Sequence, residues 1–105
     1  MDAQMKKGLL DACVLCVLEN EEGYGYKIIE DLKHVVEISE STLYPILKRL
    51  EACEYLTVQN RECNGRLRKY YRMTHKGTLR LKELRTSLRS MKNMHNFILK
   101  GEIEL

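Results

Sequence analysis

The sequence has no tryptophan, one phenylalanine and one proline among its 105 residues. It is therefore neither proline-rich nor of low complexity, and we find no internal repeat and no linker. No apolar run approaches the roughly 18 residues that a membrane-spanning helix needs. The first apolar stretch, 5–18, is interrupted by Lys6, Lys7 and Asp11, and no small-residue cleavage site follows it. We therefore expect a single domain in the cytoplasm.

The residues of common catalytic sites are also missing as patterns. We find no Ser/His/Asp arrangement, paired catalytic carboxylates, phosphate-binding loop or metal-ligand cluster. The sequence therefore predicts a protein that is not an enzyme and that carries no cofactor and no metal ion.

Four cysteines are present: Cys13, Cys16, Cys53 and Cys63. In the cytoplasm we expect them to be reduced. Cys13 and Cys16 form a C-x-x-C inside a helical pattern, without the strand that precedes a redox motif, so we expect both in the core. A zinc site that recruits all four and thiol-based sensing by an exposed Cys63 remain alternatives.

Charge is divided unevenly along the chain. Residues 1–56 carry 6 Lys and Arg against 11 Asp and Glu, a net charge of −5. Residues 57–105 carry 12 against 4, a net charge of +8. Such polarity indicates that the second half meets an anionic partner, although a solvated basic helix face explains part of it.

Helical spacing of apolar residues predicts three helices in the first half. The first, 5–19, is apolar on two sides, which indicates burial against both its own core and a partner chain. The second, 24–36, has a single apolar face. The third begins at Ser39 or Ser41, either of which can cap it, and ends near Cys53.

The third helix has two contrasting faces. Its buried stripe consists of Leu43, Ile46, Leu47 and Leu50. The opposite face is small, hydroxylated and basic, and contains Ser41, Tyr44, Pro45, Lys48 and Ala52, flanked by Thr42 and Arg49. Proline disrupts a helix interior because it lacks an N–H and clashes with the preceding turn. Pro45 therefore fits better if the helix starts at Thr42.

A basic β-hairpin follows. The strands are expected over 55–62 and 66–73, joined by Asn64-Gly65, a turn pair that tolerates positive φ at both positions. The even positions of the second strand form a basic face with one aromatic residue: Arg66, Arg68, Tyr70 and Arg72. Because no acid occurs between residues 65 and 80, we interpret this surface as a nucleic-acid contact.

The last predicted helix, 74–100, carries a heptad seam. Its apolar positions are spaced 3, 4, 3, 4 and 3 residues apart: Leu81, Leu84, Leu88, Met91, His95 and Ile98. Met94 and Phe97 widen the seam. A chain of this length cannot bury such a helix along its whole length, so the seam predicts a homodimer interface.

This order of elements predicts a mainly α fold with a small β-hairpin. It is a winged helix-turn-helix over residues 1–74, followed by a C-terminal dimerisation helix over 75–105. The third helix would enter the major groove and the hairpin, as the wing, would lie on the adjacent backbone. The residues expected to contact DNA are Ser41, Thr42, Tyr44, Lys48, Arg49, Arg66, Arg68, Lys69 and Tyr70.

Three motifs resemble those of the PadR-type transcriptional regulators. They are GYGY at 23–26, ISESTLYPILKRLE at 38–51 and GRLRKYYRMTHKG at 65–77, in the order and at the spacing of that family. The resemblance covers roughly residues 6–80. The chain is similar to the small subgroup with one C-terminal helix, but Leu67 stands where the family usually has proline.

The resemblance implies a winged-helix dimer that represses promoters, often of detoxification or export genes. It also implies that some members release DNA when a small aromatic compound binds near the dimer interface. The alternative is a winged-helix module that binds a protein and no longer binds DNA. A depleted recognition face would mark such a module, whereas Lys48, Arg49 and the wing arginines favour a sequence-specific DNA-binding regulator.

Overall fold

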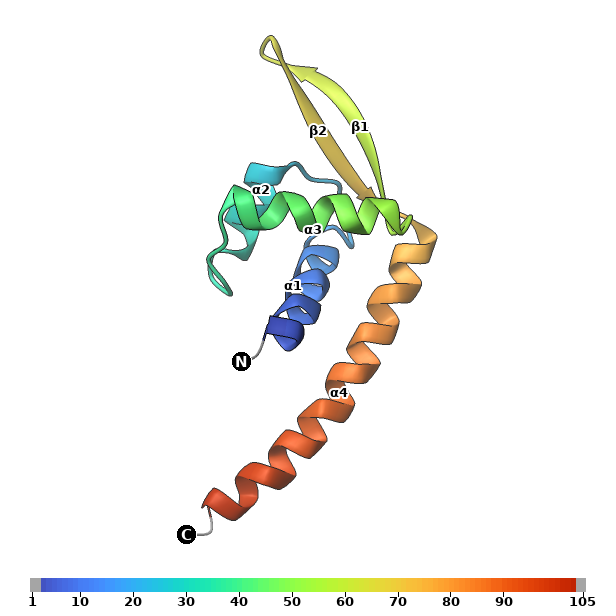
Figure 1. Ribbon diagram of the computed structural model, residues 1–105. Coiled ribbons are helices and arrows are strands. Elements are labelled where there is room, and N and C mark those ends of the chain that lie inside the picture. The colour runs from blue at the N-terminus through green and yellow to red at the C-terminus, as the bar shows by residue number, and fades with distance from the viewer. Residues whose placement is uncertain (1–2, 104–105) are drawn as a thin grey trace.

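The computed structural model describes the backbone of residues 3–103 and the side chains of residues 5–100. Three helices form a body from which a hairpin and a long helix leave in different directions (Figure 1). The elements are α1 (Ala3–Val17), α2 (Gly25–Leu32), α3 (Glu40–Ala52), β1 (Leu56–Cys63), β2 (Arg66–Met73) and α4 (His75–Ile103). The fold predicted from the sequence, mainly helical with a small hairpin, is confirmed.

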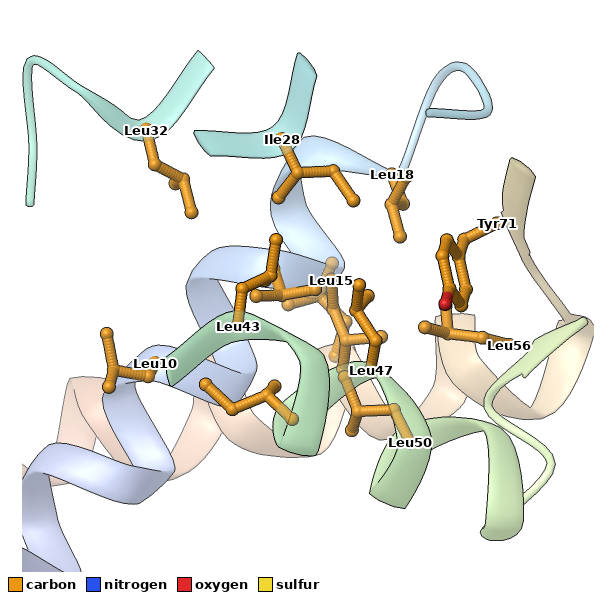
Figure 2. Close-up of a cluster of buried hydrophobic side chains, with 13 residues drawn as sticks. Leu10, Leu15, Leu18, Ile28, Leu32, Leu43, Leu47, Leu50, Leu56 and Tyr71 are labelled. Carbon is orange, nitrogen blue, oxygen red and sulfur yellow. The ribbon is translucent and has the colours of Figure 1, made fainter. Parts of the chain in front are cut away.

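One apolar core holds the body together. Leucine and isoleucine side chains from α1, α2 and α3 meet Leu56 and Tyr71 from the wing's base (Figure 2). Val14 and Leu15 of α1 are both fully buried, which fits a helix that is apolar on two sides. Burial raises the pKa of the Tyr71 phenol.

α2 is shorter than the sequence pattern suggested. The helix ends at Leu32 and the chain turns, with the Val35 and Val36 N–H groups both donating to the Leu32 carbonyl at 2.8 Å. Val35 is 74% exposed, so it does not continue the apolar face as expected. The Leu32 carbonyl thus accepts two N–H groups in a tight turn, and the helix does not continue beyond it.

α3 begins at Glu40, with Ser39 as its N-cap. The Ser39 hydroxyl accepts the Thr42 N–H at 3.3 Å, which confirms one of the two expected caps. The helix therefore starts two residues before Thr42, so the start expected from Pro45 is wrong, and Pro45 lies inside the helix. The ring lies on the exposed side, away from the packed core.

The wing is an eight-residue antiparallel pair. β1 and β2 are in register from Leu56↔Met73 to Cys63↔Arg66, and the turn residues Asn64 and Gly65 both have positive φ. At the base, Gly23 forms an isolated bridge with Tyr71, through N–H···O distances of 3.0 and 2.7 Å. This bridge fixes the segment before α2 against the wing.

α4 starts one residue after the wing ends. Thr74 caps it: the hydroxyl accepts the Gly77 N–H at 2.9 Å and donates to the Glu54 carbonyl at 2.7 Å. Gly77 is required there, since a Cβ would lie 2.3 Å from the Tyr55 carbonyl oxygen. The junction of the wing, α3 and α4 is thus fixed by hydrogen bonds and close packing.

The cysteines differ from expectation in two places. Cys13 is half-buried beside the core, but Cys16 is exposed and accepts a hydrogen bond from Arg85 of α4 at 3.5 Å. Cys63 is half-buried rather than exposed. Within the described part of the chain, no cluster of three or more metal-binding side chains occurs, and no helix is long and apolar enough to span a membrane.

Candidate nucleic-acid interface

The outward face of α3 carries most of the predicted contact residues. Ser41, Thr42, Tyr44 and Lys48 are all exposed, on the side opposite the buried leucines. The first turn is tightened by its own hydroxyls, because the Ser39 hydroxyl also lies 2.8 Å from the Ser41 hydroxyl. The helix therefore presents small polar groups at its start and one free-standing cation a turn later.

Arg49 does not join this face. Its guanidinium forms an ion pair with Asp11 of α1, and both side chains are partly buried. The pair links α3 to α1 on the inner side of the helix. Burial raises the pKa of the Asp11 carboxyl, an effect that Arg49 partly opposes. The placement argues for a structural role, so we leave Arg49 out of the contact surface proposed below.

Tyr44 leans from α3 towards the start of α2. A Cβ on residue 25 would lie 2.8 Å from the Tyr44 hydroxyl oxygen, so the absence of a side chain at Gly25 makes room for this ring. Tyr44 remains 45% exposed. The GYGY segment thus shapes the recognition surface, and Tyr26 within it is exposed.

The wing adds three cations and Tyr70, which packs against Tyr24 before α2. Arg66 and Lys69 are exposed, while the half-buried Arg68 guanidinium lies 4.6 Å from the centre of the Tyr24 ring. The Tyr70 ring meets the same Tyr24 edge-on at 5.4 Å. Tyr24 therefore contacts both Arg68 and Tyr70, two of the residues predicted to contact DNA.

A concave surface lies between the wing and the helices. This groove has a volume of about 730 Å³ and is lined by tyrosines and cations of α2, α3 and the wing: Tyr24, Gly25, Tyr26, Glu40, Tyr44, Arg66, Leu67, Arg68, Lys69 and Tyr71. Four of the residues predicted to contact DNA line it: Tyr44, Arg66, Arg68 and Lys69. Its chemistry suits a ligand that combines negative charge with flat faces.

Residues 14–83, about two thirds of the chain, match the family described as "Transcriptional regulator PadR-like family". The chain belongs to this PadR-like family. It is therefore a transcriptional regulator and not an enzyme. The resemblance noted from the three motifs is confirmed, with the winged helix-turn-helix that it implied.

Similar proteins support the same assignment. A PadR-like transcription factor from Bacteroides fragilis is 38% identical, with a TM-score of 0.81 over 91% of this chain and 95% of that one. Transcriptional regulator Rv3488 of Mycobacterium tuberculosis is 37% identical, over 69% of this chain and 68% of its own length. Bacillus subtilis PadR, solved in complex with operator DNA, is 25% identical, with a TM-score of 0.66 over 71% of this chain and 45% of that one.

Two residues that sequence reasoning missed lie beside the wing. Glu22 accepts hydrogen bonds from both terminal nitrogens of Arg61, one of them at 2.8 Å. These bonds lower the pKa of the Glu22 carboxyl. Arg61 also lies 4.8 Å from the centre of the Tyr70 ring. The bridge that brings Glu22 to the wing is a long-range contact, for which the sequence shows no local signal.

The seam of α4 divides into two parts. Leu81 is 1% exposed and packs in the core of its own chain, so it is not available to a partner, contrary to expectation. Leu84 also packs against this core, whereas Leu88 and Met91 line an apolar groove with residues of α1. His95 and Ile98 are exposed. They belong to the C-terminal half of α4, which extends past the N-terminal end of α1 (Figure 1). The seam therefore starts inside the monomer and continues outside it.

Proposed function

We propose that this PadR-like regulator binds promoter DNA as a homodimer, by inserting α3 into the major groove and laying the wing on the adjacent backbone. One observation carries the proposal: the exposed Arg66 and Lys69 of the wing line one groove together with Tyr44 of α3, and Lys48 is exposed one turn further along α3. An enzyme or a structural module has no need for three solvent-exposed cations on two neighbouring elements. The surface suits a polyanion.

The contacts fall into two kinds. A major groove about 12 Å wide admits a helix, and the hydroxyls of Ser41 and Thr42 allow the backbone of α3 to come close to base edges. Tyr44 and Lys48 lie further along the same face. Arg66, Arg68 and Lys69, with Tyr70 beside them, would contact phosphates, which position the protein without reading sequence. That Bacillus subtilis PadR was solved with operator DNA supports this arrangement.

The second half of the proposal is dimerisation through α4. Ile98 is 71% exposed, with Met94 at 60% and Phe97 at 81% next to it. Apolar side chains gathered at one end of a helix favour a second apolar surface over water. We therefore propose that Leu84, Leu88, Met91, His95 and Ile98 meet the same residues of a second copy.

This assigns DNA binding to residues 1–74 and dimerisation to 75–105, of which residues 1–2 and 104–105 lie outside the described part. A two-fold dimer would present its two α3 helices to half-sites about 34 Å apart, one turn of the double helix. Such a protein would act where promoters are, in the cytoplasm of a bacterium.

We further propose that the protein represses transcription and that a small aromatic compound releases it. The support is an apolar groove of about 220 Å³ between α1 and α4, lined by Met5, Gly8, Leu9, Leu84, Ser87, Leu88 and Met91. The groove adjoins the proposed dimer interface, so a flat apolar ligand bound there would change how two copies meet. Release is tested by adding planar aromatic compounds to a protein–promoter complex.

A salt titration tests DNA binding itself. We expect affinity for a duplex to fall steeply as salt rises, because bound phosphates exchange their counterions for protein cations. Lys48→Ala should weaken binding roughly tenfold, whereas Lys92→Ala, which removes the same charge from α4, should leave it unchanged. If the wild-type protein binds no duplex at low salt, the interaction module without DNA binding becomes the better account.

A further inference from the structure

The wing carries a like-charge pair in the half that is nearer its turn. Arg61 of β1 lies directly opposite Arg68 of β2, and side chains directly opposite one another share a face of the hairpin. Two guanidinium groups so placed repel each other and destabilise the strand pair. Some other group must therefore compensate this repulsion for the wing to hold its shape.

Glu22 is that compensating group. It precedes Gly23, whose backbone bridge to Tyr71 brings the carboxylate alongside the wing. Glu22 accepts from both terminal nitrogens of Arg61, and Arg72 lies 3.8 Å away. Only 27% of its side chain is exposed, so the carboxylate is partly shielded from water. A bidentate pair of this kind fixes direction as well as charge.

The remaining surfaces of Arg61 are also occupied. Gln59 accepts from its Nε at 3.1 Å and from its Nη2 at 2.7 Å, and Tyr70 meets its face. Tyr70 then touches Tyr24, on which Arg68 is stacked. A continuous series of contacts therefore runs from Glu22 to Arg68, from the body of the protein to a proposed phosphate contact.

We propose that Glu22 is a positioning residue that holds Arg61, Tyr70 and Tyr24 so that the wing's cations meet the backbone of a specific DNA site. The proposal rests on the DNA binding proposed above. It explains why a carboxylate stands next to a surface that should attract phosphates. A negative charge there weakens the general electrostatic attraction to DNA. We therefore assign the carboxylate the role of orienting the wing's side chains.

The two effects of this carboxylate can be separated by experiment. Glu22→Gln raises the net charge by one, and by attraction alone it should tighten binding to every duplex. If the carboxylate positions the wing, the same change should weaken binding to the specific site only. Glu21→Gln is the matched control, because the neighbouring Glu21 pairs with Lys27 and not with the wing.

The probes are a duplex that the wild-type protein selects from a random library and a random duplex of equal length. For Glu22→Gln we expect at least a tenfold loss of affinity for the selected duplex and equal or tighter binding to the random one. Arg61→Lys keeps the charge but loses the bidentate geometry, and should lower the ratio of the affinity for the selected duplex to that for the random duplex. Glu21→Gln should leave the ratio of the two affinities unchanged.

Two outcomes would count against different parts of the account. If Glu22→Gln changes both affinities alike, as its control does, Glu22 positions nothing and the inference is overturned while DNA binding stands. If the wild-type protein selects no duplex, the proposed function itself fails. Should circular dichroism show that Glu22→Gln is unfolded, Arg61→Lys decides: an unchanged ratio in that variant overturns the inference.

Discussion

Two elements project from the helical body, and they expose opposite kinds of side chain. The wing exposes Arg66 and Lys69 on either side of Leu67 and Arg68, and it is held against the body by a backbone bridge, an ion pair and an edge-on contact between two rings. The far half of α4 ends in Met94, Phe97 and Ile98 and is held at its start by Leu81 in the core. One projection offers charge to its surroundings and the other offers apolar surface.

The difference indicates two different partners. Exposed cations are well solvated in water, and their free energy falls further when they meet a polyanion. The wing therefore needs no second protein chain to cover it and remains available to DNA. Exposed apolar side chains lose free energy in water until another apolar surface covers them. The molecule would therefore be complete on the wing side as a monomer but incomplete on the α4 side. Substitutions on each projection and at their junction test this contrast.

The first prediction removes the apolar character of α4. Leu88→Lys combined with Ile98→Lys should raise the dimer dissociation constant at least 100-fold, because each lysine would be buried without a partner. Sedimentation measures the change. The control, Ser90→Lys with Asn96→Lys, adds the same charge to the same helix outside the seam and should stay dimeric. A dimer that survives the first pair would refute the assignment of the seam.

The second prediction breaks the junction from which both projections leave. Gly77→Ala should lower the free energy of unfolding by about 2–3 kcal/mol, because its Cβ would overlap the Tyr55 carbonyl. Urea denaturation measures this loss. His75→Ala changes an exposed residue in the same turn and should cost far less. Equal stability of both variants would mean that the close approach at Gly77 is not required.

The third prediction compares cations on the two projections. Arg66→Ala should weaken DNA binding roughly tenfold and lower the slope of log affinity against log salt by about 1.8, since a dimer loses two phosphate contacts. Arg89→Ala on α4 removes the same charge and should change neither quantity. Salt titrations of both variants measure the slopes. Equal slopes for the two variants would show that binding follows net charge and not the wing.

The fourth prediction concerns acid and should be the smallest. Arg85 of α4 pairs with Glu19 after α1 and lowers the pKa of that carboxyl below its ordinary value of 4.5. A lowered pKa in the folded state gives stability that is present above pH 4.5 and is lost as the pH falls through the folded value. Between pH 7 and 3, Glu19→Gln should therefore lose less stability than wild type, as should Arg85→Gln. Parallel profiles for all three proteins would show that the pair contributes nothing.

The sequence predicted what depends on local spacing. The two faces of α3, the Asn64-Gly65 turn and the apolar seam of α4 follow from periodicity and turn chemistry, and the structure contains each of them. The winged helix-turn-helix then follows from the order of elements. On the candidate interface, Ser41, Thr42, Tyr44 and Lys48 are exposed as expected, because residues on the side of a helix opposite its apolar stripe face solvent.

The expectations that differ depend on contacts between distant segments. Arg49 faces α1 because Asp11, 38 residues earlier, lies there, and helical spacing gives no sign of such a pair. Leu81 belongs to the core because α4 starts against α1, although it has the same heptad position as the exposed His95. Periodicity tells which face of a helix is apolar, but not where the neighbour that covers this face ends.

The single residue between the wing and α4 has a consequence for reading DNA. β2 ends at Met73 and α4 begins at His75, so Thr74 alone joins a stiff ribbon to a stiff rod of 29 residues. At about 1.5 Å per residue the rod is roughly 43 Å long, so a turn of about 5° at this joint would swing its far end by about 4 Å. In a dimer joined at the far ends of the two α4 helices, the same small angle would change the distance between the two DNA-binding units, each consisting of α3 and its wing.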